Sequence, residues 1–174
     1  MSLKLIPLSE NPNDGDLPLQ WSLELWGDHI PGYSRQDWIN FYENGKKANF
    51  KKWDGDSKAL IFIGKRGEEV VGAISLVDFD DLEEFRYLTP WVAAFIVNPQ
   101  LRGKGIGSEM LTALEGKAKA LEVKVLHLWT EDKSEFYQKR GYDLITEGTL
   151  EHLTFKILKK ELSASAISGT GKVE

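Results

Sequence analysis

The chain contains no cysteine among its 174 residues. It therefore has no disulfide framework, thiol nucleophile, thiolate zinc site or iron–sulfur cluster, and it fits a reducing, cytoplasmic setting. Long apolar runs are also missing: the longest, around residues 59–63 and 91–97, reach about a third of the length of a membrane-spanning helix. Residues 1–16 have one lysine and a broken apolar stretch, which is not the pattern of a secretion signal.

Charge and composition limit the classes further. Lys and Arg number 22 against 27 Asp and Glu, and the resulting net charge of −5 argues against a surface that binds nucleic acid through its phosphates. It leaves cationic partners open. Because 41% of the residues are hydrophobic, the chain has enough apolar material for one packed core. We expect a single domain over residues 1–162 and a disordered tail over the small, polar residues 163–174.

Apolar spacing predicts an α/β (α+β) chain with the element order β-αα-ββ-β-α-β-α-ββ. Alternating or continuous apolar runs predict the strands, and apolar residues three or four apart predict the helices, the second of which has Ser34 as its N-cap. We expect strands at residues 3–8, 59–63, 70–77, 91–97, 123–130, 142–146 and 150–158, and helices at residues 17–26, from Ser34 onward, and at residues 108–121 and 132–140. Residues 46–58 and 78–84 are expected connections.

The sequence VNPQLRGKGIGS, in the middle of the chain, leads from a predicted buried strand into a predicted helix. Its alternate glycines Gly103, Gly105 and Gly107 allow positive φ angles and let a ligand approach the backbone closely. The start of the helix adds unpaired N–H groups and a favourable dipole, so the expected guest is a phosphate or pyrophosphate. Arg102 and Lys104 add positive charge at the same place.

Two common nucleotide-binding motifs do not match this loop. A P-loop ends in Gly-Lys-Ser/Thr, whereas Gly107 is followed by Ser108 and Glu109. A dinucleotide fingerprint has its third glycine one position later and an acid after the next strand, where this chain has Leu128, Trp129 and Thr130. A loop whose glycines serve only the turn geometry stays an open alternative.

A second motif, FYQKRGY, runs from Phe136 to Tyr142 after a predicted helix and strand. The two motifs in this order resemble the acetyl-CoA pyrophosphate loop and the tyrosine helix of the GNAT acyltransferase superfamily, over residues 90–145. The resemblance implies the GNAT fold, a mixed, mostly antiparallel central sheet of six to seven strands with helices on both faces. It also implies transfer of an acetyl group from acetyl-CoA, the cosubstrate, to a primary amine by direct attack in a ternary complex, without a metal.

The resemblance further implies the parts of the site. The strand that ends at Val97 would splay away from the next strand, and its main chain would pair with the pantetheine arm of CoA, while the glycine loop would cradle the pyrophosphate. Tyr137 would donate a proton to the departing CoA thiolate or form a hydrogen bond with it, and the alternative is an aromatic residue packed beside Phe136 and Tyr142. The implied cofactor-binding residues are Phe95, Ile96, Val97, Arg102, Gly103, Lys104, Gly105, Ile106, Gly107 and Ser108.

The general base does not follow from the resemblance. Many relatives carry an acid on the strand equivalent to residues 91–97, and this strand has none. His127, on the next predicted strand, lies where some relatives place a glutamate base, and an imidazole suits deprotonation near neutral pH. A packed structural role for His127 stays open. Further candidates are Asp78, Glu131 and Asp132.

The acceptor would be selected by residues 19–42 and 78–89. These segments hold aromatic and imidazole rings and acids: Trp21, Trp26, His29, Tyr33, Trp38, Asp28, Asp78, Asp80, Asp81, Glu83 and Glu84. Such a rim would attract a cationic small-molecule or peptide amine. The alternative that the tryptophans face the core and that the acids belong to a solvated loop stays open. No nucleic acid or membrane partner is expected, and the resemblance leaves a homodimer open. Two alternatives also stay open: a CoA-binding protein of this fold without catalysis, and a protein that binds another phosphate ligand at the glycine loop.

Overall fold

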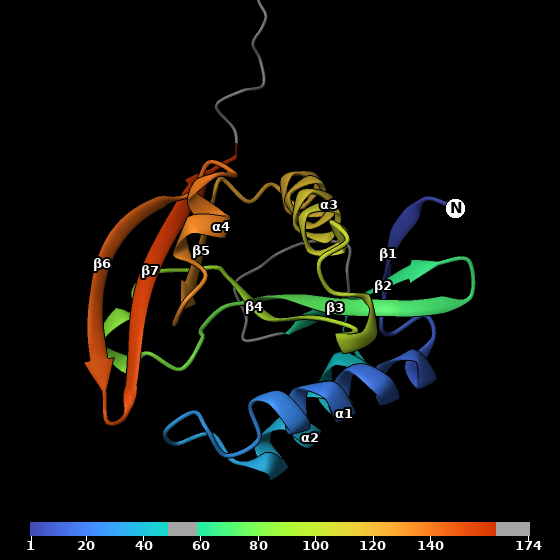
Figure 1. The fold of residues 1–174 in the computed structure, drawn as a ribbon, viewed down its shortest axis with the longest axis horizontal. Coiled ribbons are helices and arrows are strands. Elements are labelled where there is room, and N and C mark those ends of the chain that lie inside the picture. The colour runs from blue at the N-terminus through green and yellow to red at the C-terminus, as the bar shows by residue number, and fades with distance from the viewer. Residues whose placement is uncertain (49–58, 163–174) are drawn as a thin grey trace, which may run out of the picture.

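The computed structural model describes residues 1–48 and 59–162 and contains a seven-stranded sheet in the order β1-β2-β3-β4-β5-β7-β6 (Figure 1). Neighbouring strands are antiparallel, except that β4 and β5 are parallel. This confirms the predicted mixed, mostly antiparallel sheet. The strands are β1 (Leu3–Pro7), β2 (Leu60–Arg66), β3 (Glu69–Val77), β4 (Trp91–Val97), β5 (Val125–Thr130), β6 (Asp143–Leu150) and β7 (Leu153–Glu161).

Helices cover both faces of the sheet, as the resemblance implied (Figure 1). Helices α1 (Asp16–Leu25) and α2 (Arg35–Gly45) lie on one face and α3 (Ile106–Ala120) on the other, while the short α4 (Ser134–Gln138) contacts β6 and β7. Short 3-10 turns occur at Pro12–Gly15, Glu83–Phe85 and Pro99–Leu101. In the described part of the chain, no helix is long and apolar enough to cross a membrane.

The strands of the sheet bury side chains on both faces. Successive residues of a strand point to opposite sides, and β2 shows the result. Leu60 belongs to a buried cluster that includes Met110 of α3, whereas the next residue, Ile61, belongs to a cluster with Trp38 and Tyr42 of α2. The sheet is therefore the shared middle layer of two apolar cores.

Ser34 caps α2, as the sequence predicted. The backbone N–H of Asp37 donates to Ser34 Oγ at 3.2 Å, and the backbone N–H of Ser34 donates to Asp37 Oδ2 at 2.7 Å. This reciprocal capping box satisfies N–H groups that the helix itself leaves open. It fixes where α2 begins.

The predicted element order is correct, and the differences lie at element ends. The last hairpin is tighter than predicted, since β6 continues to Leu150 and β7 begins at Leu153. Glu151, in the turn between them, adopts a left-handed φ of 53°. Helix α4 is shorter than the predicted helix at residues 132–140. The predicted tail at residues 163–174 and most of the predicted connection at residues 46–58 lie outside the described residues.

The sheet and α3 approach each other closely at Gly72 of β3. A Cβ atom at this position would lie 2.5 Å from the backbone oxygen of Ile96 and 2.8 Å from Met110 Sδ. Both distances are shorter than real carbon contacts, so a larger residue would push β4 or α3 away. Gly72 thus lets α3 pack down onto the strands that carry the site.

We expect Gly72→Ala to lower the free energy of unfolding by about 1–3 kcal/mol, because the added methyl group overpacks this contact. The control is Gly116→Ala on the exposed side of α3, where a Cβ would meet nothing within 4 Å. That change should raise the free energy of unfolding by about 0.5–1 kcal/mol, since alanine favours the helix. Urea unfolding measures both, and equal effects would contradict the packing argument.

Candidate active site

β4 and β5 meet at one end and diverge at the other. Their described ladder has one pair of facing residues, Trp91 and His127, and there the N–H of His127 donates to the carbonyl of Pro90 at 3.1 Å. Past this point a cavity of about 890 Å³ is bounded by the second half of β4, the end of β5, the loop before α3 and α4. Figure 1 shows β5 and β7 turned away from the direction of β3. The cleft implied by the resemblance is therefore present.

A bulge in β4 helps to open this cleft. The pairing of β3 with β4 skips one residue of β3 but two residues of β4, Ala94 and Phe95. Ala94 has a φ of 48°, a left-handed conformation that costs about 1 kcal/mol for a residue with a Cβ atom. Both residues line the cavity. The bulge bends β4 and removes its backbone groups from the ladder where the cavity begins.

The loop between β4 and α3 closes one end of the cavity. Gly103 and Gly105 have φ angles of 79° and 82°, and Gly105 is the N-cap of α3. A Cβ atom at either position would meet nothing within 4 Å, so the space in front of the loop is open. The N–H groups of Ile106, Gly107 and Ser108 belong to the first turn, which has no carbonyl of its own helix to bind. An open cradle of N–H groups at a helix start fits a pyrophosphate.

The structure brings nearly all of the predicted cofactor-binding residues to this cavity. Its lining includes Phe95, Ile96, Val97, Arg102, Gly103, Gly105, Ile106, Gly107 and Ser108. Lys104 is exposed and is not part of the lining. Arg102 Nε donates to the carbonyl of Val97 at 3.3 Å, which holds its side chain near the end of β4.

Tyr137 of α4 also lines the cavity. Its ring packs edge-on against Phe136 and Tyr142, with centroids 5.1 and 5.8 Å away. Among the described residues its hydroxyl has no hydrogen-bond partner. Burial raises the pKa of Tyr137, so the phenol keeps its proton at neutral pH and can donate it.

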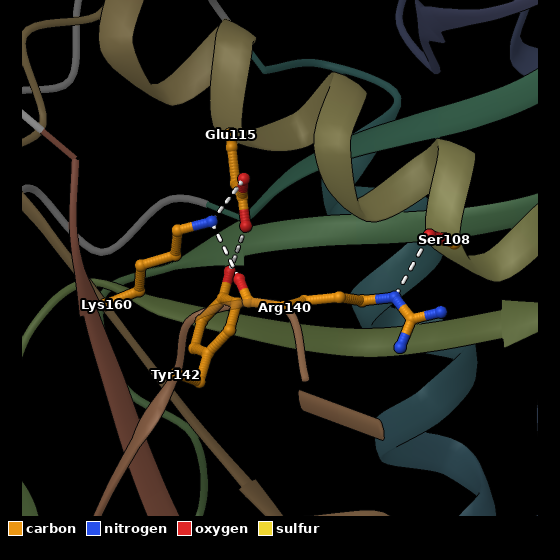
Figure 2. Close-up of polar contacts among 5 residues, drawn as sticks. All are labelled: Ser108, Glu115, Arg140, Tyr142 and Lys160. Atoms are coloured by element: carbon orange, nitrogen blue, oxygen red, sulfur yellow. Dashed lines mark hydrogen bonds and ion pairs between the residues drawn. The ribbon is translucent and has the colours of Figure 1, made fainter. Parts of the chain in front are cut away.

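The end of α4 is fastened to α3 and β7 by polar contacts (Figure 2). Arg140 Nε donates to Ser108 Oγ at 3.0 Å, in the first turn of α3. Lys160 Nζ donates to the carbonyl of Arg140 at 2.9 Å and to Glu115 Oε1 at 3.0 Å, and the Tyr142 hydroxyl donates to Glu115 Oε2 at 2.8 Å. These contacts fix the helix that carries Tyr137 relative to the glycine loop.

His127 lies on β5 but not among the residues that line the cavity. It is 6% exposed, and its Nδ1 is 3.0 Å from the carbonyl of Pro90, so Nδ1 carries the proton of this hydrogen bond. The ring lies 5.8 Å from that of Trp91. Burial lowers the pKa of His127. Because His127 does not line the cavity, the cavity geometry does not support the expectation that it acts as the general base.

A pair of carboxyl groups lies at the other end of the cleft, after β3. Asp80 lines the cavity, and its backbone carbonyl accepts a hydrogen bond from Trp129 Nε1 at 3.0 Å. Burial raises the pKa of Asp80 well above its usual range, and the carboxylate of Asp81 beside it adds to the shift. Burial also raises the pKa of Asp81 to about 6. Two neighbouring carboxyl groups in a poorly solvated place hold protons that isolated acids would lose.

Aromatic rings and a second acid complete this end of the cavity. Trp26 and Trp38 are stacked, with centroids 5.3 Å apart and planes at 10°, and both line it. His29 Nε2 lies 2.9 Å from Glu131 Oε2, and His152 Nε2 donates to the carbonyl of His29 at 2.7 Å. These contacts join the α1–α2 loop, the β5–α4 loop and the β6–β7 turn around one opening.

Two residues of the cavity have no individual role in the sequence expectations. From sequence, Asp80 belongs only to a general acidic rim, and Arg140 belongs only to the tyrosine motif. The signal for Asp80 is its place just past the end of a buried strand. The signal for Arg140 is its distance of three residues from Tyr137 within the predicted helix at residues 132–140, although α4 itself ends at Gln138.

Comparison with known proteins agrees with this architecture. Residues 24–142 match the model of a family described as Acetyltransferase (GNAT) family. The structure of an aminoglycoside 6'-acetyltransferase type Ii aligns with a TM-score of 0.66 and 15% identity, over 93% of this chain and 97% of that one. A GNAT family acetyltransferase from Staphylococcus aureus MU50 gives 0.62 and 16%, over 92% and 99%. One from Elizabethkingia anophelis with acetyl-CoA bound gives 0.58 and 17%, over 92% and 98%. These likenesses confirm the predicted fold.

The acid pair predicts how stability depends on pH. The folded-state pKa values of Asp80 and Asp81 are raised, to about 6 for Asp81. Their contribution to the free energy of unfolding is therefore full below about pH 4, and it is lost as the pH rises through the raised pKa values. Asp80→Asn removes one ionisable group, so it should be more stable than the parent at pH 8 and equal to it near pH 4. Urea unfolding at both pH values measures this. A difference that does not change with pH, or one matched by the exposed control Asp143→Asn, would contradict it.

Proposed function

Because the chain belongs to the GNAT acetyltransferase family, we propose that it transfers an acetyl group from acetyl-CoA to a primary amine by direct attack within a ternary complex. The observation that carries this proposal is the cleft between β4 and β5. The glycine loop stands at one end, carboxyl groups stand at the other, and Tyr137 lines the same cavity. The chain has no cysteine for a covalent acyl intermediate, in keeping with direct transfer.

The geometry supports an assignment of the residues that would hold acetyl-CoA. The N–H groups of Ile106 to Ser108 would bind the pyrophosphate, and Gly103 and Gly105 leave room for it. The bulged stretch of β4 presents backbone groups that an extended pantetheine arm can pair with. When bound, acetyl-CoA supplies the acetyl group as a thioester, which a neutral amine attacks directly.

Tyr137 would act at the leaving group. Its hydroxyl is protonated, has no partner among the described residues and lies in the cavity. We assign it the transfer of its phenolic proton, or a hydrogen bond, to the departing sulfur. The raised pKa means that this donor is present across the whole neutral range.

Asp80 would act at the amine. It lines the cavity at the end opposite the glycine loop, where an acceptor can enter past Trp26 and His29. A carboxylate whose pKa is raised well above the usual range is a better proton acceptor than an ordinary aspartate. We therefore assign to Asp80, and not to His127, the role of taking the proton from the attacking amine.

A cationic amine suits the acceptor end. The stacked Trp26 and Trp38 give apolar faces, the carboxylate of Glu131 gives negative charge in the same cavity, and Asp80 adds to that charge when it is ionised. Ammonium groups bind to such combinations of aromatic faces and carboxylates. An aminoglycoside acetyltransferase is among the proteins with this fold, so polycationic amines belong in the first panel of acceptors.

The test of this function is a binding and turnover screen. Acetyl-CoA should raise the melting temperature, and CoA should be released with at least one amine among polyamines, aminoglycosides, amino acids and short peptides with free amino ends. Binding without turnover for every amine would support a CoA-binding protein without catalysis. Stabilisation by another phosphate compound, with none by CoA, would support a different ligand.

We expect Tyr137→Phe to lower kcat about a hundredfold or more, with little change in the KM for acetyl-CoA, because the variant loses only the proton donor. Steady-state kinetics with the best amine measures this. The control is Tyr87→Phe, which removes a hydroxyl from a residue that is 76% exposed and outside the cavity. Full activity of Tyr137→Phe would rule out the assigned role.

We expect kcat of the parent to rise with pH as Asp80 loses its proton, and Asp80→Asn to lose that rise together with about a hundredfold or more in rate. The pH profile of kcat measures both effects. Glu131→Gln removes another carboxylate of this end and should keep the pH profile of the parent. If Glu131→Gln lost the rise of kcat with pH and Asp80→Asn kept it, the general base would be Glu131 and not Asp80.

A further inference from the structure

Arg140 lies where the tyrosine helix meets the glycine loop. Its Nε donates to Ser108 Oγ at 3.0 Å and its Nη1 to the carbonyl of Phe136 at 2.7 Å. The guanidinium carbon lies 3.7 Å from the centre of the Phe136 ring. Arg140 lines the same cavity as Gly105 and Gly107. Figure 2 shows its side chain stretched from the end of α4 towards the first turn of α3.

Most of the donors of this guanidinium are uncommitted. Arginine has five N–H donors, and the two hydrogen bonds above use two of them. Arg140 is in none of the ion pairs found among the described residues. A partly buried cation with three spare donors and no carboxylate partner is suited to an anionic ligand.

The cation is also held in place before any ligand arrives. The Phe136 ring supports one face of the guanidinium, and Ser108 fixes its Nε. Lys160 of β7 donates to the backbone carbonyl of Arg140 and to Glu115 of α3, and so holds the backbone of Arg140 in place (Figure 2). Because its side chain is ordered in advance, little conformational entropy is left to lose on binding.

We propose that Arg140 binds the pyrophosphate of CoA directly, beside the backbone N–H groups of the glycine loop. This inference rests on the proposed function, because it takes CoA as the ligand. It places just after α4 a charge that the sequence alone placed on Arg102 and Lys104. Of those two, Lys104 lies outside the cavity lining, whereas Arg102 lines the cavity and donates its Nε to the carbonyl of Val97.

The position of Ser108 points to the pyrophosphate and not to the 3'-phosphate. Ser108 is in the first turn of α3, and its backbone N–H is one of the donors of the cradle. Its hydroxyl is the atom to which Arg140 Nε is bonded. The guanidinium therefore flanks the cradle itself, so one phosphate group can accept hydrogen bonds from both.

The test compares Arg140→Gln with the parent in binding CoA, 3'-dephospho-CoA and pantetheine, by calorimetry for the nucleotides and ligand-observed NMR for pantetheine. We expect the variant to bind CoA and 3'-dephospho-CoA about ten- to a hundredfold more weakly and pantetheine unchanged, because only the first two carry a pyrophosphate. The matched control is Lys139→Gln, which removes a neighbouring exposed charge that is not in the cavity lining and should bind all three like the parent.

Each of the other possible binding results contradicts one specific claim. Weaker binding of pantetheine as well would show that Arg140 only shapes the site, and a loss confined to CoA would move the contact to the 3'-phosphate. Equal binding by Arg140→Gln and the parent would end the inference while leaving the proposed function intact. If the parent did not bind CoA, the proposed function itself would fail.

A second variant separates a phosphate contact from a structural role. Ser108→Ala removes the hydroxyl that accepts from Arg140 but keeps the guanidinium and the backbone N–H of the cradle. We expect a much smaller loss of CoA affinity than in Arg140→Gln. A loss as large as that of Arg140→Gln would mean that Arg140 acts only through Ser108, and it would overturn the direct contact.

Discussion

The shape of the site depends on how β4 and β5 share the sheet, as parallel neighbours held together at one end only. The cores on both faces keep them apart: Trp91 of β4 and Leu126 of β5 are both fully buried, so neither strand can move without opening a core. Backbone groups of β4 that lack a strand partner then face a space where water or a ligand must satisfy them. The divergence therefore provides both a cavity and a strand edge along its wall.

Helix α4 shows how tertiary contacts stabilise an element that is too short to be stable alone. A five-residue helix gains little from its own hydrogen bonds, since nucleation of a helix is unfavourable. Here the carboxylate of Glu115 receives both the Lys160 ammonium and the Tyr142 hydroxyl, while Arg140 reaches α3 at its first turn. Contacts with α3 and β7 thus fix the position of Tyr137, and a change in either element would shift its hydroxyl.

Much of the fold and half of the site could be predicted from the sequence, because their signals are local. Strand and helix periods, the Ser34 cap and the glycine loop each depend on residues a few positions apart. The rest depends on contacts between distant segments. The bulge at Ala94 has no sequence signal, since alanine rarely takes a left-handed φ, and such a conformation persists only where the surrounding structure holds it. The burial of Asp80 and the path of Arg140 to Ser108 likewise exist only in the folded chain.

The net charge of −5 says little about either ligand, because the cavity separates the charges that matter. Arg102 and Arg140 stand at the end of the glycine loop, and Asp80 and Glu131 stand at the other end. Within a partly desolvated cleft each charge acts mainly on its nearest neighbours. An ammonium group entering beside Asp80 would lower the pKa of that carboxyl group, since an opposite charge favours the ionised form. Under the proposed mechanism, a cationic acceptor would thus favour the carboxylate form of Asp80, and acceptor binding and the ionisation of Asp80 would be linked.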